Sequence, residues 1–204
     1  MKKVILLFLF VCSSVAYADE AVDSAKTLPA TKLESFSAKT GIVIIRAFSN
    51  MGNIYGSGSG HVSVDAREFR DASNPKSREY GIAVEVKEAG RLERENTSYI
   101  DYDEIESLIR GIDYIAEIDK SVTSMDNFEA HYKTKGDFSI VTFSSQSGEI
   151  KVAVSSGRIG KTTAFLKLSD LSKLKDLVTQ ARSKIDSIRG SLNSSPEGVK
   201  KKNK

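Results

Sequence analysis

The chain of 204 residues contains no tryptophan, one cysteine, three prolines and two histidines. Because the cysteine, Cys12, lies in a segment that the sequence marks for removal, we expect no disulfide, thiol nucleophile or thiolate metal site in the mature chain. The content of 40% hydrophobic and 28% charged residues excludes collagen-like and strongly disordered classes. No apolar run reaches the ~20 residues that cross a bilayer as a helix. We therefore expect one or at most two small domains.

The first eighteen residues carry the strongest single pattern of the chain. Lys2 and Lys3 precede an apolar run over 4–11, and a region of small residues ends at Ala18. This order is typical of a secretory signal peptide at 1–18, so we predict cleavage between Ala18 and Asp19 and an exported protein, either periplasmic or secreted. The alternative, a membrane anchor, needs a longer apolar run.

The positive charge of the chain lies at its two ends. Of the formal net charge of +3, two charges come from the signal segment and three from residues 191–204, which leaves −2 for residues 19–190. We predict that 191–204 is a disordered tail and that 19–40 is a polar leader or linker. A weak, salt-sensitive contact with an anionic partner is expected only from the tail lysines, Lys200, Lys201, Lys202 and Lys204.

Residues 41–190 carry the patterns of a single α+β domain. The β-branched run 42–45 predicts a strand buried on both faces, and the glycine-rich stretch 50–60 predicts a flexible loop. Apolar residues alternate with polar ones over 62–66 and again over 82–86. This period of two predicts a long antiparallel hairpin.

A short strand at 97–100 leads into an amphipathic helix, because apolar residues recur at helical spacing after Asp103. Two capping boxes fit the start of this helix, Asp103 with Glu106 or Asp101 with Glu104, and the sequence does not choose between them. These crowded carboxylates favour a helix N-terminus electrostatically, which explains them without a substrate.

The second half repeats this plan. A second amphipathic helix is expected from Ser169 or Ser172 to a stop at Gly190, after strands at 128–132, 138–143, 150–154 and 162–168. Four strands and a helix thus occur twice, which predicts an α+β fold with antiparallel sheets, two amphipathic helices and a tandem ββββα repeat.

A true duplication stays open. An offset of 66 residues aligns many apolar positions of the halves 41–120 and 121–190. The same offset, however, sets the expected strand 138–143 against the turn 72–77. A shared strand and helix periodicity also produces such matches without common ancestry.

Two glycine-containing stretches look like ligand loops but lack the elements that should flank them. The stretch 157–162 follows Ser155, where a phosphate loop needs glycine, and both it and 56–60 lead into strands rather than helices. His61 and His131 are too few for a metal site without cysteine ligands, and both are expected at the surface. The sequence therefore predicts no catalytic, cofactor-binding or metal-binding residue.

The expected topology has four antiparallel strands followed by a helix, and this unit occurs twice. At the level of topology alone, it is similar to that of the Whirly and purine-element-binding (Pur) class of single-strand nucleic-acid proteins. This resemblance implies binding of single-stranded nucleic acid on a sheet, but no motif assigns binding positions in this chain. Such binding needs a positive groove with aromatic stacking platforms, and the body of the chain carries no excess of positive charge.

We therefore expect an exported, non-enzymatic protein that binds a partner protein or an envelope component through a sheet face or an edge strand. One alternative is an exported hydrolase whose acid and base come from scattered Asp, Glu and His residues, with Asp103 and His131 as the first positions to test. The other alternative is single-stranded nucleic-acid binding by the Whirly-like or Pur-like topology.

Overall fold

The computed structural model describes residues 31–58, 60–88, 93–144 and 149–194. The expected signal peptide with its cleavage site Ala18–Asp19, and most of the expected leader, lie outside the described residues. So do the four tail lysines, Lys200, Lys201, Lys202 and Lys204. No helix of the described ranges is both long enough and apolar enough to span a bilayer.

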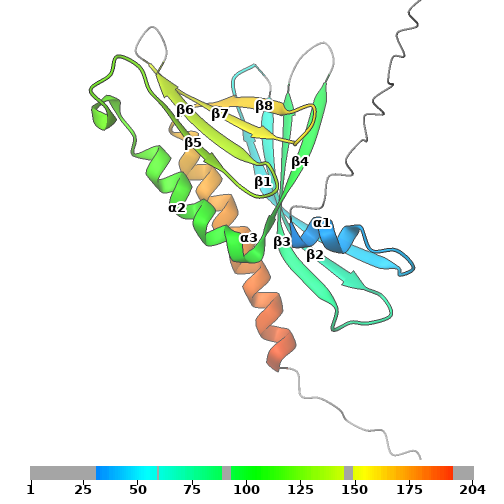
Figure 1. Cartoon of the computed structure of the whole chain (residues 1–204). Coiled ribbons are helices and arrows are strands. Elements are labelled where there is room, and N and C mark those ends of the chain that lie inside the picture. Colours follow the sequence, from blue (N-terminus) through cyan, green and yellow to red (C-terminus); the bar gives the residue numbers. More distant parts are fainter. Residues whose placement is uncertain (1–30, 59, 89–92, 145–148, 195–204) are drawn as a thin grey trace, which may run out of the picture.

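The first four strands form one antiparallel sheet, here called sheet A, in the order β1-β2-β3-β4 (Figure 1). Its strands are β1 (Ile44–Tyr55), β2 (His61–Asp71), β3 (Arg78–Glu88) and β4 (Arg94–Asp101). A short 3-10 helix, η1 (Tyr102–Glu104), then leads directly into helix α2 (Ile105–Ala116).

The next four strands form a second antiparallel sheet, sheet B, in the order β5-β6-β7-β8. After η2 (Lys120–Val122), its strands are β5 (Glu129–Lys133), β6 (Ser139–Ser144), β7 (Ile150–Ser156) and β8 (Thr162–Leu166), and helix α3 (Asp170–Ser194) follows. The α+β fold with two ββββ units is thereby confirmed. Equal strand order does not establish common ancestry, so the duplication stays a prediction.

The two sheets and the two long helices share one hydrophobic core, which contains Val84, Ile112, Val154 and Val178. Helix α3 packs on sheet A, although it follows sheet B in the chain, and α2 lies beside α3. Figure 1 shows α2 running along β5, where a Cβ on Gly111 would clash with the ring of Tyr132. Each half of the chain therefore helps to bury the other.

The strand predicted to be buried on both faces is an edge strand, and the loop predicted at 50–60 is mostly strand. Strand β1 extends from Ile44 to Tyr55, with a bulge between Asn50 and Gly52. Gly52 has a φ of 138°, so the glycine serves the bulge rather than a loop. A β-branched run suits a buried central strand and an edge strand equally, which explains the error.

Part of the expected leader is folded. Residues Lys32–Ser37 form helix α1, begun by a capping box between Thr31 and Glu34. Leu33 and Phe36 are buried against Phe69 on the face of sheet A that α3 leaves open. The hydrophobic contact of these two residues, and not the polar composition around them, decides the structure of this segment.

The carboxylate of Asp101 holds α1 in place. This side chain is almost fully buried and accepts hydrogen bonds from the backbone N–H groups of Lys32, at 2.9 Å, and Leu33, at 3.3 Å. The bonds satisfy amides that the start of a helix leaves without an internal partner. Asp101 therefore caps α1. The sequence had suggested instead that it caps the helix that follows it.

The predicted stop at Gly190 is wrong, because α3 continues to Ser194. A glycine ends a helix when it adopts a left-handed conformation, and Gly190 has no positive φ. Residues 191–194, expected in the disordered tail, therefore belong to the last turn of α3.

We predict that Leu33→Ala lowers the free energy of unfolding by roughly 2–5 kcal/mol, as truncation of a fully buried leucine does. Urea denaturation followed by circular dichroism measures the change. The matched control is Ser35→Ala on the exposed side of the same helix, which loses one hydrogen bond to the carbonyl of Thr31 and is expected to cost only about 0.5–1.5 kcal/mol. Equal stability of all three proteins would show that α1 is not part of the core.

Candidate interaction surface

The glycine stretches are turns. Gly157 and Gly160, with φ of 102° and 65°, form the turn from β7 to β8, and the stretch leads into β8 instead of a helix. The turn from β1 to β2 is closed by a hydrogen bond from the N–H of Gly56 to the carbonyl of Gly60, and it leads into β2. Neither turn has the helix that a phosphate-binding loop requires.

The two histidines lie far apart in the topology. His61 begins β2 and packs beside the ring of Tyr55, with ring centroids 5.7 Å apart, and His131 is exposed on β5. In the described ranges no three His, Cys, Asp or Glu side chains cluster as a metal site would require. Asp103 is ion-paired with Lys32, at 2.8 Å.

The acidic cluster at 101–106 is divided among separate partners. Neither of the capping boxes predicted for α2 is formed, because Asp101 bonds to α1, and no side chain caps α2. Asp103 pairs with Lys32 and Glu106 with Arg182. These carboxylates tie together three helical elements, so they are used for structure.

Glu104 is the least satisfied member of this cluster. Its Oε1 accepts the backbone N–H of Lys135 at 2.9 Å, whereas its Oε2 is buried without a hydrogen-bond partner in the described part of the chain. Burial raises the pKa of Glu104 above its ordinary value, against the smaller opposing effect of Lys135.

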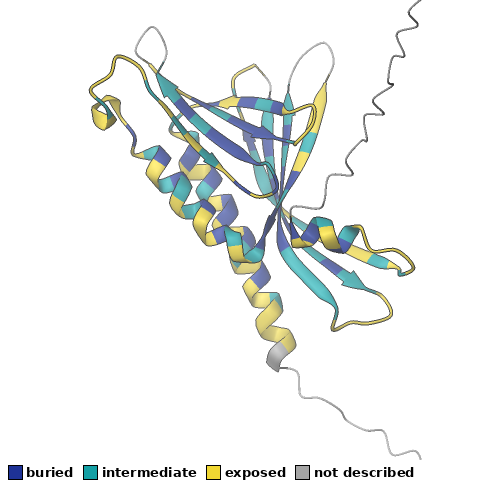
Figure 2. Cartoon of the chain, in the orientation of Figure 1, coloured by how far each residue is buried: buried dark blue, intermediate teal, exposed yellow. Residues whose placement is uncertain are grey.

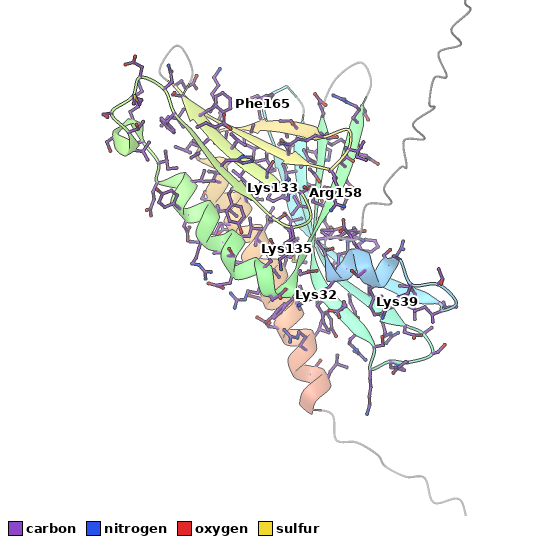
Figure 3. All side chains as sticks on the ribbon, in the orientation of Figure 1. Lys32, Lys39, Lys133, Lys135, Arg158 and Phe165 are labelled. Carbon is purple, nitrogen blue, oxygen red and sulfur yellow. The ribbon has the colours of Figure 1, made fainter. Side chains whose placement is uncertain are left out.

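Figure 3 labels five cationic residues, of which two come from α1 or just after it and three from sheet B and its turns: Lys32, Lys39, Lys133, Lys135 and Arg158. Much of their charge is already paired. Asp137 accepts from Lys133 at 2.7 Å and from Arg158 at 2.6 Å. Burial raises the pKa of Asp137, but these two hydrogen bonds outweigh it and hold the pKa below its ordinary value. Lys133, Asp137 and Arg158 therefore form a structural network.

The outer edge of β1 lacks most of the features that protect edge strands. Strand β1 pairs with β2 on one side, and no described strand pairs with it on the other. Its 12 residues include one charged side chain, Arg46, and no proline or lysine. Natural edge strands usually carry such residues, or are short, in order to prevent pairing with other chains.

Large apolar side chains are exposed along this edge. Phe48 is 66% exposed and lies under the guanidinium of Arg67, 4.8 Å from the ring centroid. Just before and within β1, Val43 is 67% exposed and Ile45 39%. Figure 2 shows exposed residues along the outer part of β1, in contrast to the buried middle of sheet A.

The direction of the backbone groups follows from one hydrogen bond. The carbonyl of Val43 accepts the N–H of Ala72, so Val43 and then every second residue point toward β2. The backbone N–H and C=O groups of Ile44, Arg46 and Phe48 therefore point away from sheet A. They form a row of donors and acceptors that no strand of the described ranges pairs.

A small hollow of about 60 Å³ adjoins the same edge, between sheet A and α3. Ala47, Ser49, Tyr80 and Ile188 contribute to its walls. The hollow is large enough for a small side chain but not for a drug-sized ligand. The edge of β1 thus has both outward-pointing backbone N–H and C=O groups and a hollow that can take one small side chain.

The chain matches no protein-family model, and no curated protein is significantly similar to it. Its function is therefore argued from these surfaces alone.

We predict that Glu104→Gln makes the protein more stable at neutral pH. A carboxyl whose pKa is raised on folding binds its proton more tightly in the folded state, so stability falls as pH rises from 4.5, its ordinary pKa, through the raised value. Glutamine removes this loss and keeps an acceptor for Lys135. Urea unfolding at pH 4 and pH 7 measures the change, and a variant with the same pH dependence as wild type would refute the assignment.

Proposed function

We propose that this protein is an exported, non-enzymatic binding protein that takes up an extended segment of a partner protein as a further strand beside β1. The observation that carries the proposal is the unpaired edge of β1, with its single charged residue. Strand addition satisfies the backbone groups of such an edge, and pockets for alternate side chains provide selectivity.

The edge also indicates the chemistry of the partner. An added strand would place its side chains alternately beside the exposed apolar residues Ile45 and Phe48, on opposite faces of the sheet. The hollow next to Ala47 accepts one small side chain. Arg46, the only charge of β1, favours a carboxylate opposite it. The expected partner segment is extended, mostly apolar and acidic at one position.

Export rests on the sequence pattern of residues 1–18 and is part of the proposal. The non-enzymatic role is supported by the use of the acidic side chains in structural contacts. Asp103 and His131, the positions of the hydrolase alternative, belong to different elements, and Asp103 is held by Lys32.

Strand addition is tested by retention of a partner on immobilised protein. We expect the wild-type protein to retain a protein from an envelope fraction, and Arg46→Pro to lose it, because proline removes a backbone N–H that points to the edge. Phe48→Lys should lose it as well, because a lysine on an edge strand opposes pairing. Both variants should unfold cooperatively, with a lower midpoint for Phe48→Lys because it sets a lysine opposite Arg67.

The matched control is Tyr114→Lys, which replaces an aromatic residue on α2 of nearly equal exposure, 67% against 66%. This variant should retain the same partner. The proposal is overturned if no partner is retained, or if Arg46→Pro retains it as well as Tyr114→Lys does.

A further inference from the structure

A second hollow, here called the η2 hollow, lies where α2 leads into η2. Its volume is about 250 Å³, and its lining lies within residues 114–122. Two of its walls are large apolar side chains that are partly open to solvent, Tyr114 at 67% and Val122 at 46% exposed. Met125, just beyond them in the chain, is 75% exposed. Exposed apolar groups that gather in this way are typical of an interaction surface.

The surroundings of the η2 hollow are acidic. The mostly exposed stretch 117–129 contains four carboxylates and one lysine: Glu117, Asp119, Asp126, Glu129 and Lys120. Among the ion pairs of the described residues, none involves a charge of this stretch. The hydroxyl and the N–H of Ser121 donate to Asp119 and hold the pKa of this carboxyl below its ordinary value. The net charge of −3 favours a cationic partner and disfavours nucleic acid.

The chain itself contains a segment of matching chemistry. Beyond the described end of α3, Val199 is followed by three lysines in succession, and a fourth stands at 204. An apolar side chain next to several cations complements an apolar hollow next to several carboxylates. The match therefore combines an apolar contact with opposite charges.

A molecule cannot place this valine in its own hollow. Helices α2 and α3 run antiparallel, and Asp113 near the end of α2 pairs with Lys175 at 2.7 Å. Figure 1 shows η2, the short green helix at the upper left, at the opposite end of the molecule from the C-terminal end of α3. From the level of Lys175 to Ser194, α3 extends for about 28 Å. The residues that follow Ser194, up to Val199, span at most about 18 Å.

We propose that the η2 hollow binds the segment 199–202 of a second copy of this chain. Its valine packs against Tyr114 and Val122, and its lysines face Glu117 and Asp119. Such a contact joins two different surfaces of the same protein, so it leaves one hollow and one tail unoccupied and continues head to tail into chains or rings. The contact is separate from the edge of β1 and does not depend on the proposed partner.

Sedimentation equilibrium of the purified protein tests the contact. The mean mass of the wild-type protein should rise with concentration beyond that of a dimer at low salt. It should return toward that of the monomer at about 1 M salt, where the screening length falls to ~3 Å.

Two variants remove the two sides of the contact. The tail variant combines four substitutions: Lys200→Gln, Lys201→Gln, Lys202→Gln and Lys204→Gln. It should weaken association about tenfold, because several exposed ion pairs are lost together. Tyr114→Lys should weaken it at least as much, because it removes one wall of the hollow and sets a cation beside the incoming lysines.

A mixture of these two variants distinguishes loss of the contact from loss of folding. The tail variant keeps an intact hollow, and Tyr114→Lys keeps an intact tail. Equal amounts of the two should therefore form a dimer with one copy of each, which grows no further. Because each variant lacks one side of the contact, neither should form this dimer alone at the same concentration.

The matched control is Phe48→Lys, which replaces an aromatic residue of nearly equal exposure on β1 and should associate as wild type does. The proposal is overturned if the wild-type protein stays monomeric up to its solubility limit, or if either variant associates as wild type does. It is also overturned if the mixture forms no dimer. Loss of association in Phe48→Lys alone would assign the contact to the edge of β1 and overturn it as well.

Discussion

The mutual covering of the two halves is the constraint on which the rest of the structure depends. A four-stranded sheet with one apolar face must bury that face against another layer. Sheet A is covered by α3, which comes from the second half of the chain, and α2 of the first half lies beside α3 and runs along β5 of sheet B. This arrangement uses both long helices to cover sheet faces, and neither remains to cover the edge of β1.

Strand and helix periods predicted most of the fold, because they report local alternation between core and solvent. They failed where a contact distant in the sequence decides the outcome. Helix α1 is too short to be stable alone and depends on the carboxylate of Asp101 and on Phe69. The capping box of Thr31 and Glu34 was a local signal that could have indicated its start.

The candidate sites were less predictable than the fold. The β-branched run at 42–45 suits an edge and a central strand alike, so its exposure depends on sheet order, which no local pattern contains. Tyr114 lies off the apolar face of α2, and Val122 belongs to no periodic pattern. They share a hollow only through the turn that follows α2, where Ile118 is buried. Side chains that acquire a role through such packing cannot be recognised from spacing.

The claim that β1 offers a free edge is tested most directly by amide hydrogen exchange in the protein without a partner. The account predicts alternating protection, with fast exchange at Ile44, Arg46 and Phe48 and slow exchange at Ile45, Ala47 and Ser49, whose N–H groups bond to β2. Equal, strong protection of all six amides would show that another strand already covers this edge and would contradict the account.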